Sequence, residues 1–235
     1  MKYSYSIIIP SKSEYKNLKI ILPIIRKKFN HEICLVNKTL NKNEEIFLKK
    51  ITSKLNIKYI KQNSDGKGMA LREAANKASG DILIFFDADF SHDVNDIDKI
   101  ISIFEKKKID HVGGSRLTGG SDELFSSISH LFRLIGSLII NYVINFKFNV
   151  KLTDSQNGLR GIKKSVFKIL KTTSSHTTIE MELVYKTLQK KYSYLEIPTH
   201  EYSRKFGKSK IFLWKHSWSY IYRLIIIIFL KKNKI

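Results

Sequence analysis

Cysteine and long apolar runs are both scarce in this chain. The one cysteine, Cys34, excludes a disulfide within the chain and indicates a reducing compartment, and its apolar neighbours predict that it is buried. The uninterrupted run Leu224–Leu230 has 7 residues, far short of the roughly 20 that a membrane-spanning helix needs. The apolar stretch near the N-terminus is too short for a signal peptide, so we expect any catalytic part to face the cytoplasm.

Acidic residues are also scarce. The sequence has 21 Asp and Glu against 42 Lys and Arg, a net charge of +21. Part of this excess reflects a general abundance of Lys, Ile and Asn, and the rest predicts an anionic partner such as phosphates or anionic lipid headgroups. Basic and aromatic residues are not interleaved, and neither helix-turn-helix nor zinc-ligand spacing occurs, so we do not expect nucleic-acid binding. With 43% apolar residues, the 235-residue chain can bury a sizeable core.

Strand-like and helix-like segments alternate through the first half of the chain. We expect strands over 5–11, 31–37, 57–62 and 81–89, and helices over 14–29, 42–56, 66–80 and 94–108. This alternation predicts an α/β fold with a central, mostly parallel sheet, right-handed crossovers and flanking helices.

The second half has longer apolar segments. We expect a strand over 110–117, a long apolar helix over 123–146, a helix over 176–191, a strand over 194–198 and a basic loop over 201–210. The tail, residues 211–235, is apolar and aromatic with a basic end. Neither an internal repeat nor a low-complexity linker is present, so we expect one domain, 1–210, followed by the tail.

The stretch ILIFFDADFSHD, residues 82–93, places two carboxylates beyond a buried strand. Five apolar residues precede Asp87, and Asp89 follows two positions later. Carboxylates at this end of a strand lie where open α/β sheets bind ligands. Because two unpaired carboxylates this close repel each other, a divalent cation is their natural partner. The alternative is a carboxylate turn that caps the helix beginning near Val94.

Several motifs in a fixed order over residues 5–211 together resemble family 2 glycosyltransferases. IIIPSKSE resembles their strand-end I-P-T-x-N-E, GKGMALREAANKASGD resembles the helix before their metal-binding strand, and FFDADFSHD resembles their D-A-D-x-S/Q-H. GSRLTGG and TDSQNGLRGIKKSVF follow in the expected order. The segment IEMELVYKTLQKKYSYLEIPTHEYSRKFGKSKI matches, without a gap, the pattern of dolichol- and polyprenyl-phosphate mannose synthases. The resemblance implies a GT-A fold, which is Rossmann-like, for residues 1–210.

This resemblance implies a nucleotide-sugar donor whose diphosphate is neutralised by Mg²⁺ or Mn²⁺. Asp89 would be the main metal ligand, Asp87 would serve the metal or the ribose, and Ser91 lies where a third ligand often sits. The positions that match further donor contacts are Pro10, Glu14, Val36 and Ala88. Glu14 has a structural alternative as a charge at the N-terminus of a helix.

The chain departs from the family pattern after the second strand. Val36 matches an apolar position beside the base, but the two acidic residues that usually follow are replaced by Asn37 and Lys38. A carboxylate that could accept hydrogen bonds from a base or ribose has become a cation. The base of the donor, and therefore its sugar, is left open.

Basic residues of the second half match phosphate contacts of the family. Arg116 resembles an arginine at the phosphate site. Arg133 and Ser137 are four apart, so they share one helix face, with His130 a turn earlier. The family places such an arginine and serine at the acceptor lipid phosphate, where a guanidinium suits the phosphate oxygens. The alternative is a solvated polar stripe on the helix.

A basic loop is expected to close over the donor diphosphate. Arg204 and Lys210 match basic residues of that loop, and Gly207 between them gives it freedom; an ordinary surface loop is the alternative. A lipid phosphate is already an anion at pH 7, so we expect electrostatic catalysis rather than a nucleophilic side chain. Glu180 and Glu182 fall where a relative with a hydroxyl acceptor carries its base, and their spacing lets only one face the site.

The tail pattern favours a membrane interface. Its aromatic residues Trp214, Trp218, Tyr220 and Tyr222 suit that depth, and Lys231 and Lys232 suit anionic headgroups. The alternative is a C-terminal helix packed on the domain. We expect a peripheral protein at the cytoplasmic face of the inner or endoplasmic reticulum membrane, and the sequence leaves open whether a small membrane partner helps to anchor it.

The resemblance therefore implies an inverting, metal-dependent glycosyltransferase. We expect it to move mannose from GDP-mannose to a polyprenyl or dolichyl phosphate. Two other functions stay open: transfer to a sugar hydroxyl in cell-surface glycan assembly, and a non-catalytic nucleotide-binding relative, which Asn37 and Lys38 would suit.

Overall fold

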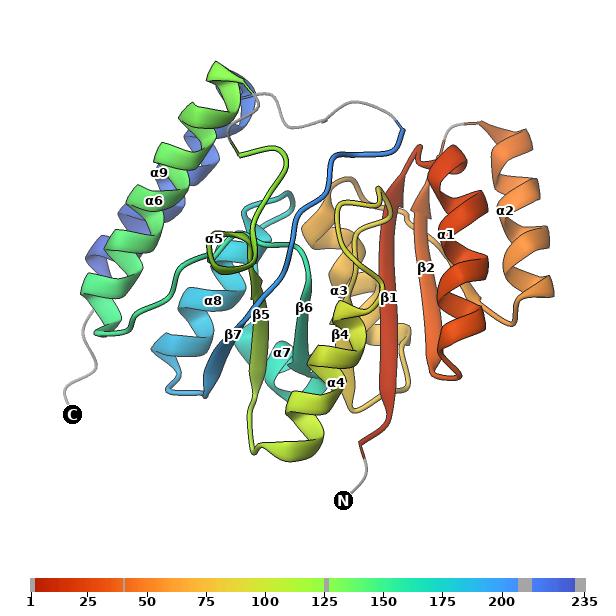
Figure 1. Cartoon of the computed structure of the whole chain (residues 1–235), viewed down its shortest axis with the longest axis horizontal. Coiled ribbons are helices and arrows are strands. Elements are labelled where there is room, and N and C mark those ends of the chain that lie inside the picture. The colour runs from red at the N-terminus through yellow and green to blue at the C-terminus, as the bar shows by residue number, and fades with distance from the viewer. Residues whose placement is uncertain (1–2, 40, 125–126, 207–212, 231–235) are drawn as a thin grey trace.

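The computed structural model describes residues 3–39, 41–124, 127–206 and 213–230, with the backbone only for 213–217. Within this described part, seven strands form one sheet in the order β3-β2-β1-β4-β6-β5-β7 (Figure 1). The strands are β1 (Tyr5–Lys12), β2 (Glu32–Lys38), β3 (Lys58–Lys61), β4 (Ile82–Phe85), β5 (His111–Ser115), β6 (Arg160–Lys163) and β7 (Tyr194–Pro198). Pairing is parallel except at β6, which runs antiparallel to β4 and β5. The predicted mostly parallel sheet is confirmed.

Strand β6 is not among the predicted strands. Its residues, RGIK, contain no apolar run that would indicate a strand. Gly161 instead lies opposite Ile84 of β4 and Val112 of β5. A Cβ at Gly161 would lie 2.5 Å from Cγ2 of Ile100, so the close packing of a helix over this strand requires glycine. Tertiary pairing rather than local periodicity makes this segment a strand.

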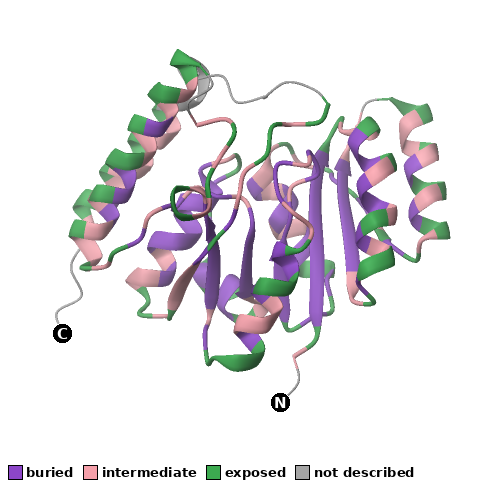
Figure 2. Cartoon of the chain, viewed as in Figure 1, coloured by how far each residue is buried: buried purple, intermediate pink, exposed green. Residues whose placement is uncertain are grey.

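Helices cover both faces of the sheet. They are α1 (Tyr15–Lys28), α2 (Lys42–Lys54), α3 (Lys67–Lys77), α4 (Asp96–Lys106), α5 (Arg116–Gly119), α6 (Ile128–Phe148), α7 (Lys164–Leu170), α8 (Ile179–Gln189) and α9 (Leu213–Phe229). Ile7 and Ile9 of β1 pack with α1 and α4, whereas Ile8 packs with α3, α7 and α8. Because successive strand residues point to opposite faces, this central strand is buried on both sides (Figure 2).

Helices α6 and α9 lie side by side, away from the sheet (Figure 1). They pack on α8 through a separate apolar cluster that includes Ile144, Tyr185 and Ile227. Exposed residues run along α6 (Figure 2). By length and composition, α6 alone among the described helices could cross a membrane, although 22% of its apolar window is buried inside the molecule. The predicted helix in the tail is present as α9, and its inner side is packed rather than free.

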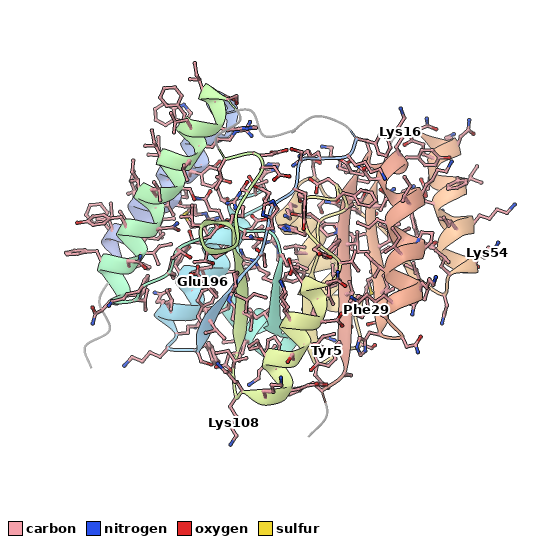
Figure 3. All side chains as sticks on the ribbon, viewed as in Figure 1. Tyr5, Lys16, Phe29, Lys54, Lys108 and Glu196 are labelled. Atoms are coloured by element: carbon pink, nitrogen blue, oxygen red, sulfur yellow. The ribbon has the colours of Figure 1, made fainter. Side chains whose placement is uncertain are left out.

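Part of the basic excess lies away from these elements. Lys16 on α1, Lys54 at the end of α2 and Lys108 after α4 are exposed and project from separate parts of the surface (Figure 3). The positive charge is therefore not confined to one motif. Residue 210, the predicted end of the catalytic domain, lies outside the described residues.

Candidate active site

A cavity of about 1190 Å³ opens beyond the carboxyl ends of β1 and β4. Its walls come from these strand ends, the start of α3, and the sides of α6, α8 and α9. From the first half of the chain, the predicted site residues that line it are Pro10, Glu14, Asp87, Ala88, Asp89 and Ser91. From the second half they are Arg116, Arg133, Ser137 and Arg204. The fold thus gathers predicted residues from distant parts of the chain, at the edge where parallel sheets bind ligands.

The loop after β4 carries the paired carboxylates. The strand ends at Phe85, so both carboxylates lie beyond it rather than inside the longer predicted strand. Ser91 donates its amide and its hydroxyl to Oδ1 of Asp89, at 3.1 and 2.6 Å, which makes a tight turn. Nη2 of Arg204 lies 3.0 Å from Oδ2 of Asp89. Arg204 belongs to the predicted basic loop 201–210. Lys210, the other predicted basic residue of the loop 201–210, lies outside the described residues.

A lysine that the sequence analysis missed neutralises the first carboxylate. Nζ of Lys67 lies 2.7 Å from Oδ1 of Asp87 and 2.7 Å from Oε1 of Glu180. Burial alone would lower the pKa of Lys67, but the charges of Asp87 and Glu180 outweigh it and raise that pKa. Burial would likewise raise the pKa of Asp87, yet Lys67, and then His92, hold it below its usual range. The lysine's position between two glycines at a helix start was its only signal in the sequence.

Gly158 allows this close arrangement. A Cβ at Gly158 would lie 2.1 Å from Oδ2 of Asp87 and 2.9 Å from Nζ of Lys67. The loop between α6 and β6 therefore presses directly against the ion pair, and a larger residue there would push it aside.

The structure separates the two glutamates at the start of α8. Glu180 lines the cavity and contacts Lys67. Glu182 points elsewhere: its fully buried carboxylate accepts from the amides of Thr173 and Ser174 and from Nζ of Lys186. Burial alone would raise the pKa of Glu182, but the hydrogen bonds from Lys186 and Ser174 lower it from 4.5 to about 2. The prediction that only one of the two faces the site is confirmed, and Glu180 is that residue.

Arg116 lines the cavity with its charge already matched. Its Nε lies 2.7 Å from Oδ2 of Asp154, and its Nη1 lies 3.2 Å from Oε1 of Glu201. Burial alone would lower the pKa of Arg116, but Asp154 and then Glu201 raise it. The guanidinium thus joins the start of α5 to two other loops.

The cavity face of α6 carries the predicted polar pair. Arg133 and Ser137 both line the cavity, as does His130 one turn earlier. Nε2 of Gln156 donates to Oγ of Ser137 at 3.2 Å. Gln156 was not predicted, because its loop gave no signal beyond the family motif. The shared helix face inferred from the four-residue spacing does point into the cavity.

The resemblance placed Val36, near the end of β2, beside the base of the donor, but the structure does not bring Val36 to the cavity wall. Val36 is fully buried in the core and is not among the described residues that line the cavity. Asn37 is buried, and its side-chain amide reaches the hydroxyl of Tyr59 at 3.4 Å. Lys38 lies 3.4 Å from Oδ1 of Asp65, a carboxylate on the cavity wall that the sequence analysis missed.

Pro10 and Glu14 occupy the cavity wall where β1 gives way to α1. Oε2 of Glu14 accepts from Nδ2 of Asn17 at 2.7 Å. Glu14 stands at the N-cap position of α1, although its side chain makes no capping hydrogen bond there. Glu14 therefore stands at the N-terminus of a helix, as the structural alternative expected, and it also lines the cavity.

The paired carboxylates fit a hard divalent cation as part of a ligand set. Among the described residues, no group of three or more His, Cys, Asp or Glu side chains is arranged for a metal ion. Mg²⁺ is commonly held by one or two carboxylates together with substrate phosphates, so Asp87 and Asp89 beside the hydroxyl of Ser91 are a suitable half-site. A cation there would compete with Lys67 and Arg204 for the carboxylate oxygens.

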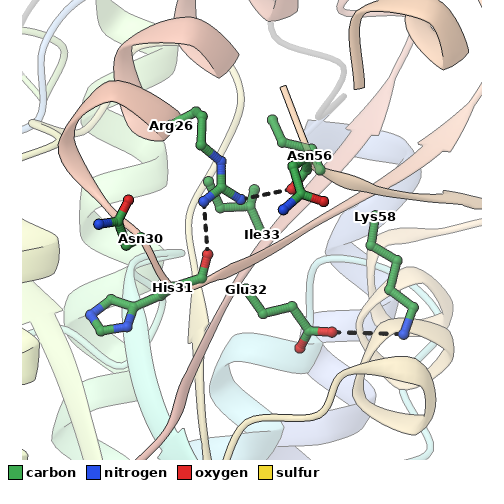
Figure 4. A pocket seen from close by; sticks show the side chains of 8 residues that line it. Arg26, Asn30, His31, Glu32, Ile33, Asn56 and Lys58 are labelled. Atoms are coloured by element: carbon green, nitrogen blue, oxygen red, sulfur yellow. Dashed lines mark hydrogen bonds and ion pairs between the residues drawn. The ribbon is translucent and has the colours of Figure 1, made fainter. Parts of the chain in front are cut away.

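A second, smaller cavity lies at the opposite edge of the sheet, near the start of β2 (Figure 4). Arg26 projects into it, and its Nη atoms donate to the carbonyl groups of Phe29, His31 and Asn56. Glu32 and Lys58 form an ion pair at 3.7 Å. These donors are already used within the protein, so the cavity shows a structural use of arginine rather than a ligand site.

Comparison with known proteins finds curated relatives that are named as sugar transferases. The chain is 26% identical over 216 residues to a dolichol-phosphate mannosyltransferase of Pyrococcus furiosus, covering 88% of this chain and 58% of that protein. It is 31% identical over 112 residues to a UDP-N-acetylglucosamine–dolichyl-phosphate N-acetylglucosaminyltransferase of Methanococcus voltae, covering 46% of this chain and 43% of that protein. The chain thus spans about half the length of the curated relatives that it matches.

Solved structures share the fold. Glucosyl-3-phosphoglycerate synthase from Mycobacterium tuberculosis, in complex with phosphoglyceric acid, superposes with a TM-score of 0.74 at 13% identity. The superposition covers 98% of this chain and 82% of that chain. The same enzyme in complex with Mn²⁺, uridine-diphosphate and glucosyl-3-phosphoglycerate gives a TM-score of 0.71 at 12% identity, covering 96% and 78% of the two chains. The predicted GT-A fold is confirmed.

A protein-family model matches most of the chain. The model described as Glycosyl transferase family 2 matches residues 6–170, from the first strand to the end of α7. This range holds the paired carboxylates and the polar face of α6. The chain belongs to glycosyltransferase family 2.

Proposed function

We propose that this protein is an inverting glycosyltransferase that moves a sugar from a nucleotide-sugar to a polyprenyl or dolichyl phosphate. GDP-mannose is the first donor to test, since the 26%-identical relative is a dolichol-phosphate mannosyltransferase. A second relative is named for UDP-N-acetylglucosamine, so the donor panel must include it.

The observation that carries this proposal is the mixed character of one cavity. Around Asp87, Asp89 and Arg204 its wall is polar and charged. Between α6 and α9 the same cavity is lined by apolar side chains, namely Phe132, Leu134, Ile139, Ile140, Ile221 and Leu224. A nucleotide diphosphate suits the first part, and an isoprenoid chain that carries a phosphate suits a passage from the second part to the first.

The transfer would be a single displacement. An oxygen of the lipid phosphate attacks the anomeric carbon while the bond from that carbon to the donor diphosphate breaks, and its electron pair leaves on the nucleoside diphosphate. The lipid phosphate needs no strong base, because its second pKa is near ~6. Arg204 would steady the leaving diphosphate. A Mg²⁺ or Mn²⁺ held by Asp87, Asp89 and Ser91 would supply further positive charge for that group.

Arg133 and Ser137 would hold the attacking phosphate. They share the cavity face of α6, with apolar residues of the same helix beside them. A guanidinium and a hydroxyl can both donate to phosphate oxygens. Arg116 is a further candidate contact, and a phosphate there would compete with Asp154 and Glu201 for its donors.

The outer sides of α6 and α9 support a place at a membrane. Their exposed large apolar residues include Ile135, Tyr142 and Phe146 on α6, and Trp218, Tyr222 and Phe229 on α9. Exposed apolar area of this kind, on a chain of net charge +21, suits an anionic membrane surface. We therefore place the protein at the cytoplasmic face of a membrane, with 1–210 as the catalytic domain and 211–235 as the membrane-associating segment.

A donor panel tests the proposal. Purified full-length protein is mixed with polyprenyl phosphate, Mg²⁺ or Mn²⁺, and labelled GDP-mannose, UDP-glucose or UDP-N-acetylglucosamine. We expect label in the organic extract with one donor and none with Asp89→Asn. Asp93→Asn is the matched control, since that carboxylate follows the same motif and accepts from the amide of Asn95 instead.

The other outcomes separate the competing functions. Label that appears only in glycans would indicate that the acceptor is a sugar hydroxyl rather than a lipid phosphate. Glu180, on the cavity wall, would then be the candidate base. If no donor is bound or used, the protein is a non-catalytic relative. Asn37 and Lys38, which replace two acidic residues of the family pattern, are the residues that suggested this function. Undiminished transfer by Asp89→Asn would overturn the assignment of the metal-binding carboxylate.

A further inference from the structure

Helix α9 forms part of the active-site wall. Ser219, Tyr220, Ile221 and Leu224 all line the cavity that holds Asp87 and Asp89. The tail pattern predicted a membrane-facing helix and gave no sign of this second role. A helix at the end of the described chain can complete a cavity only if something holds it in register with the rest of the fold.

Polar anchors on the inner side of α9 meet the short segment 172–177 and Glu182 of α8. The hydroxyl of Tyr220 donates to Oγ1 of Thr177 at 3.0 Å. Nη1 of Arg223 lies 3.3 Å from Oε1 of Glu182, and its Nη2 donates to Oγ1 of Thr173 at 3.0 Å. Arg223 is 12% exposed on a largely apolar helix, where a cation is costly to bury unless it is paired.

The segment that receives these anchors is fixed from its other side. The amide of Gly68 donates to the carbonyl of Ser175 at 2.8 Å, and Arg72 donates to the carbonyl of Ser174 at 2.8 Å. A Cβ at Gly68 would lie 2.0 Å from the carbonyl oxygen of Ser174, so the first turn of α3 and this segment are in close contact. Segment 172–177 is therefore a firm base for α9 rather than a loose loop.

We propose that Arg223 is a positioning residue that docks α9 onto segment 172–177, so that α9 forms the wall beside the acceptor. The role rests on the proposed function, because the acceptor is the lipid phosphate defined there. Two of the cavity-lining residues of α9, Tyr220 and Leu224, pack against the apolar cluster that contains Ile140 and Ile144 of α6, the helix that carries Arg133 and Ser137. Undocking α9 should therefore weaken acceptor binding and leave the nucleotide in place.

The two faces of α9 differ: one is exposed and the other lines the cavity. Trp218 and Tyr222 are exposed on its outer side, whereas Tyr220 and Leu224 line the cavity on its inner side. The same helix thus offers apolar area to a bilayer and closes the site where a lipid phosphate would enter. The docking of α9 would place that entrance at the membrane surface.

Three variants test the proposal in the full-length protein. Arg223→Met removes the cation but keeps most of the side-chain volume, and Arg223→Lys keeps a cation near Glu182. Arg26→Met is the matched control, because Arg26 also binds protein groups through its guanidinium but lies at the second cavity. Polyprenyl phosphate KM, nucleoside diphosphate Kd by calorimetry, and amide hydrogen exchange of α9 are measured for each.

For Arg223→Met we expect the acceptor KM to rise about tenfold, with the nucleotide Kd changed less than about twofold. Exchange should quicken in α9 peptides and not in β1 or β4 peptides. Arg223→Lys should recover part of the KM, and Arg26→Met should leave KM and α9 exchange unchanged. An unchanged KM in Arg223→Met, or equal losses in KM and nucleotide Kd, would overturn the proposed role.

Failure of the proposed function looks different. If the wild-type protein transfers no sugar to lipid, the enzyme assignment fails, and the exchange experiment still decides whether Arg223 docks α9. Protection of α9 that is the same in wild type and Arg223→Met would refute the docking whatever the reaction is.

Discussion

The buried carboxylate of Glu182 should make a large, pH-dependent contribution to stability. It has no exposed surface and accepts from Thr173, Ser174, Lys186 and Arg223 at 2.6 to 3.3 Å. Its pKa falls from 4.5 to about 2 in the folded protein. A difference of about 2.5 pKa units corresponds to about 3 kcal/mol at pH 7.

The sign follows from the depressed pKa. A carboxyl group whose folded pKa lies below its unfolded pKa stabilises the fold above the unfolded value, and this contribution is lost as the pH falls through the folded value. The stabilisation from Glu182 is therefore complete above about pH 5.5, falls to about 1.4 kcal/mol at pH 3, and is nearly gone below pH ~2.

Glu182→Gln removes this charge with little change in volume. We expect its free energy of unfolding to be about 3 kcal/mol lower than wild type at pH 7 and about 1.4 kcal/mol lower at pH 3. The assay is urea unfolding in detergent solution, followed by circular dichroism at both pH values. Glu105→Gln is the control, since Glu105 is exposed on α4. A loss for Glu182→Gln that is the same at both pH values would refute the electrostatic reasoning and leave only packing.

Three further outcomes test the site. Lys67→Met should lower kcat about tenfold or more, because Asp87 and Glu180 would be left as neighbouring unpaired carboxylates; unchanged turnover would contradict this. Gly158→Ala should reduce nucleotide binding in calorimetry, since its Cβ would overlap Oδ2 of Asp87, and wild-type affinity would count against that contact. Arg133→Ala should raise the acceptor KM more than the donor KM, and equal changes would argue against a phosphate contact.

Short-range patterns were sufficient for the elements near the paired carboxylates. The apolar run before Asp87 predicted a buried central strand, which is present as β4, and the polar residues after it line the cavity beyond that strand. The four-residue spacing of Arg133 and Ser137 predicted a shared helix face, and that face lines the cavity. These inferences held because strand alternation and helix periodicity are local properties of the backbone.

Long-range contacts decided the rest of the site. Lys67 and Glu180 are far apart in sequence, so their ion pair could not be inferred from either segment. The same holds for Arg116, predicted as a phosphate contact, which is matched by Asp154 and Glu201 from two other loops. The motif placed Val36 beside the base, but Val36 is buried in an apolar cluster with residues of α3 and does not line the cavity among the described residues.

Local sequence patterns were enough to predict an α/β chain with carboxylates beyond a central strand, a polar pair on one helix face and an apolar, aromatic tail. Each of these follows from residue periodicity or from the chemistry of neighbouring residues. Three features became visible only in the folded chain: β6 joins the sheet, Glu180 rather than Glu182 faces the cavity, and α9 forms part of the cavity wall. The reason is physical: these depend on which distant segments pack together, and packing is set by the whole chain.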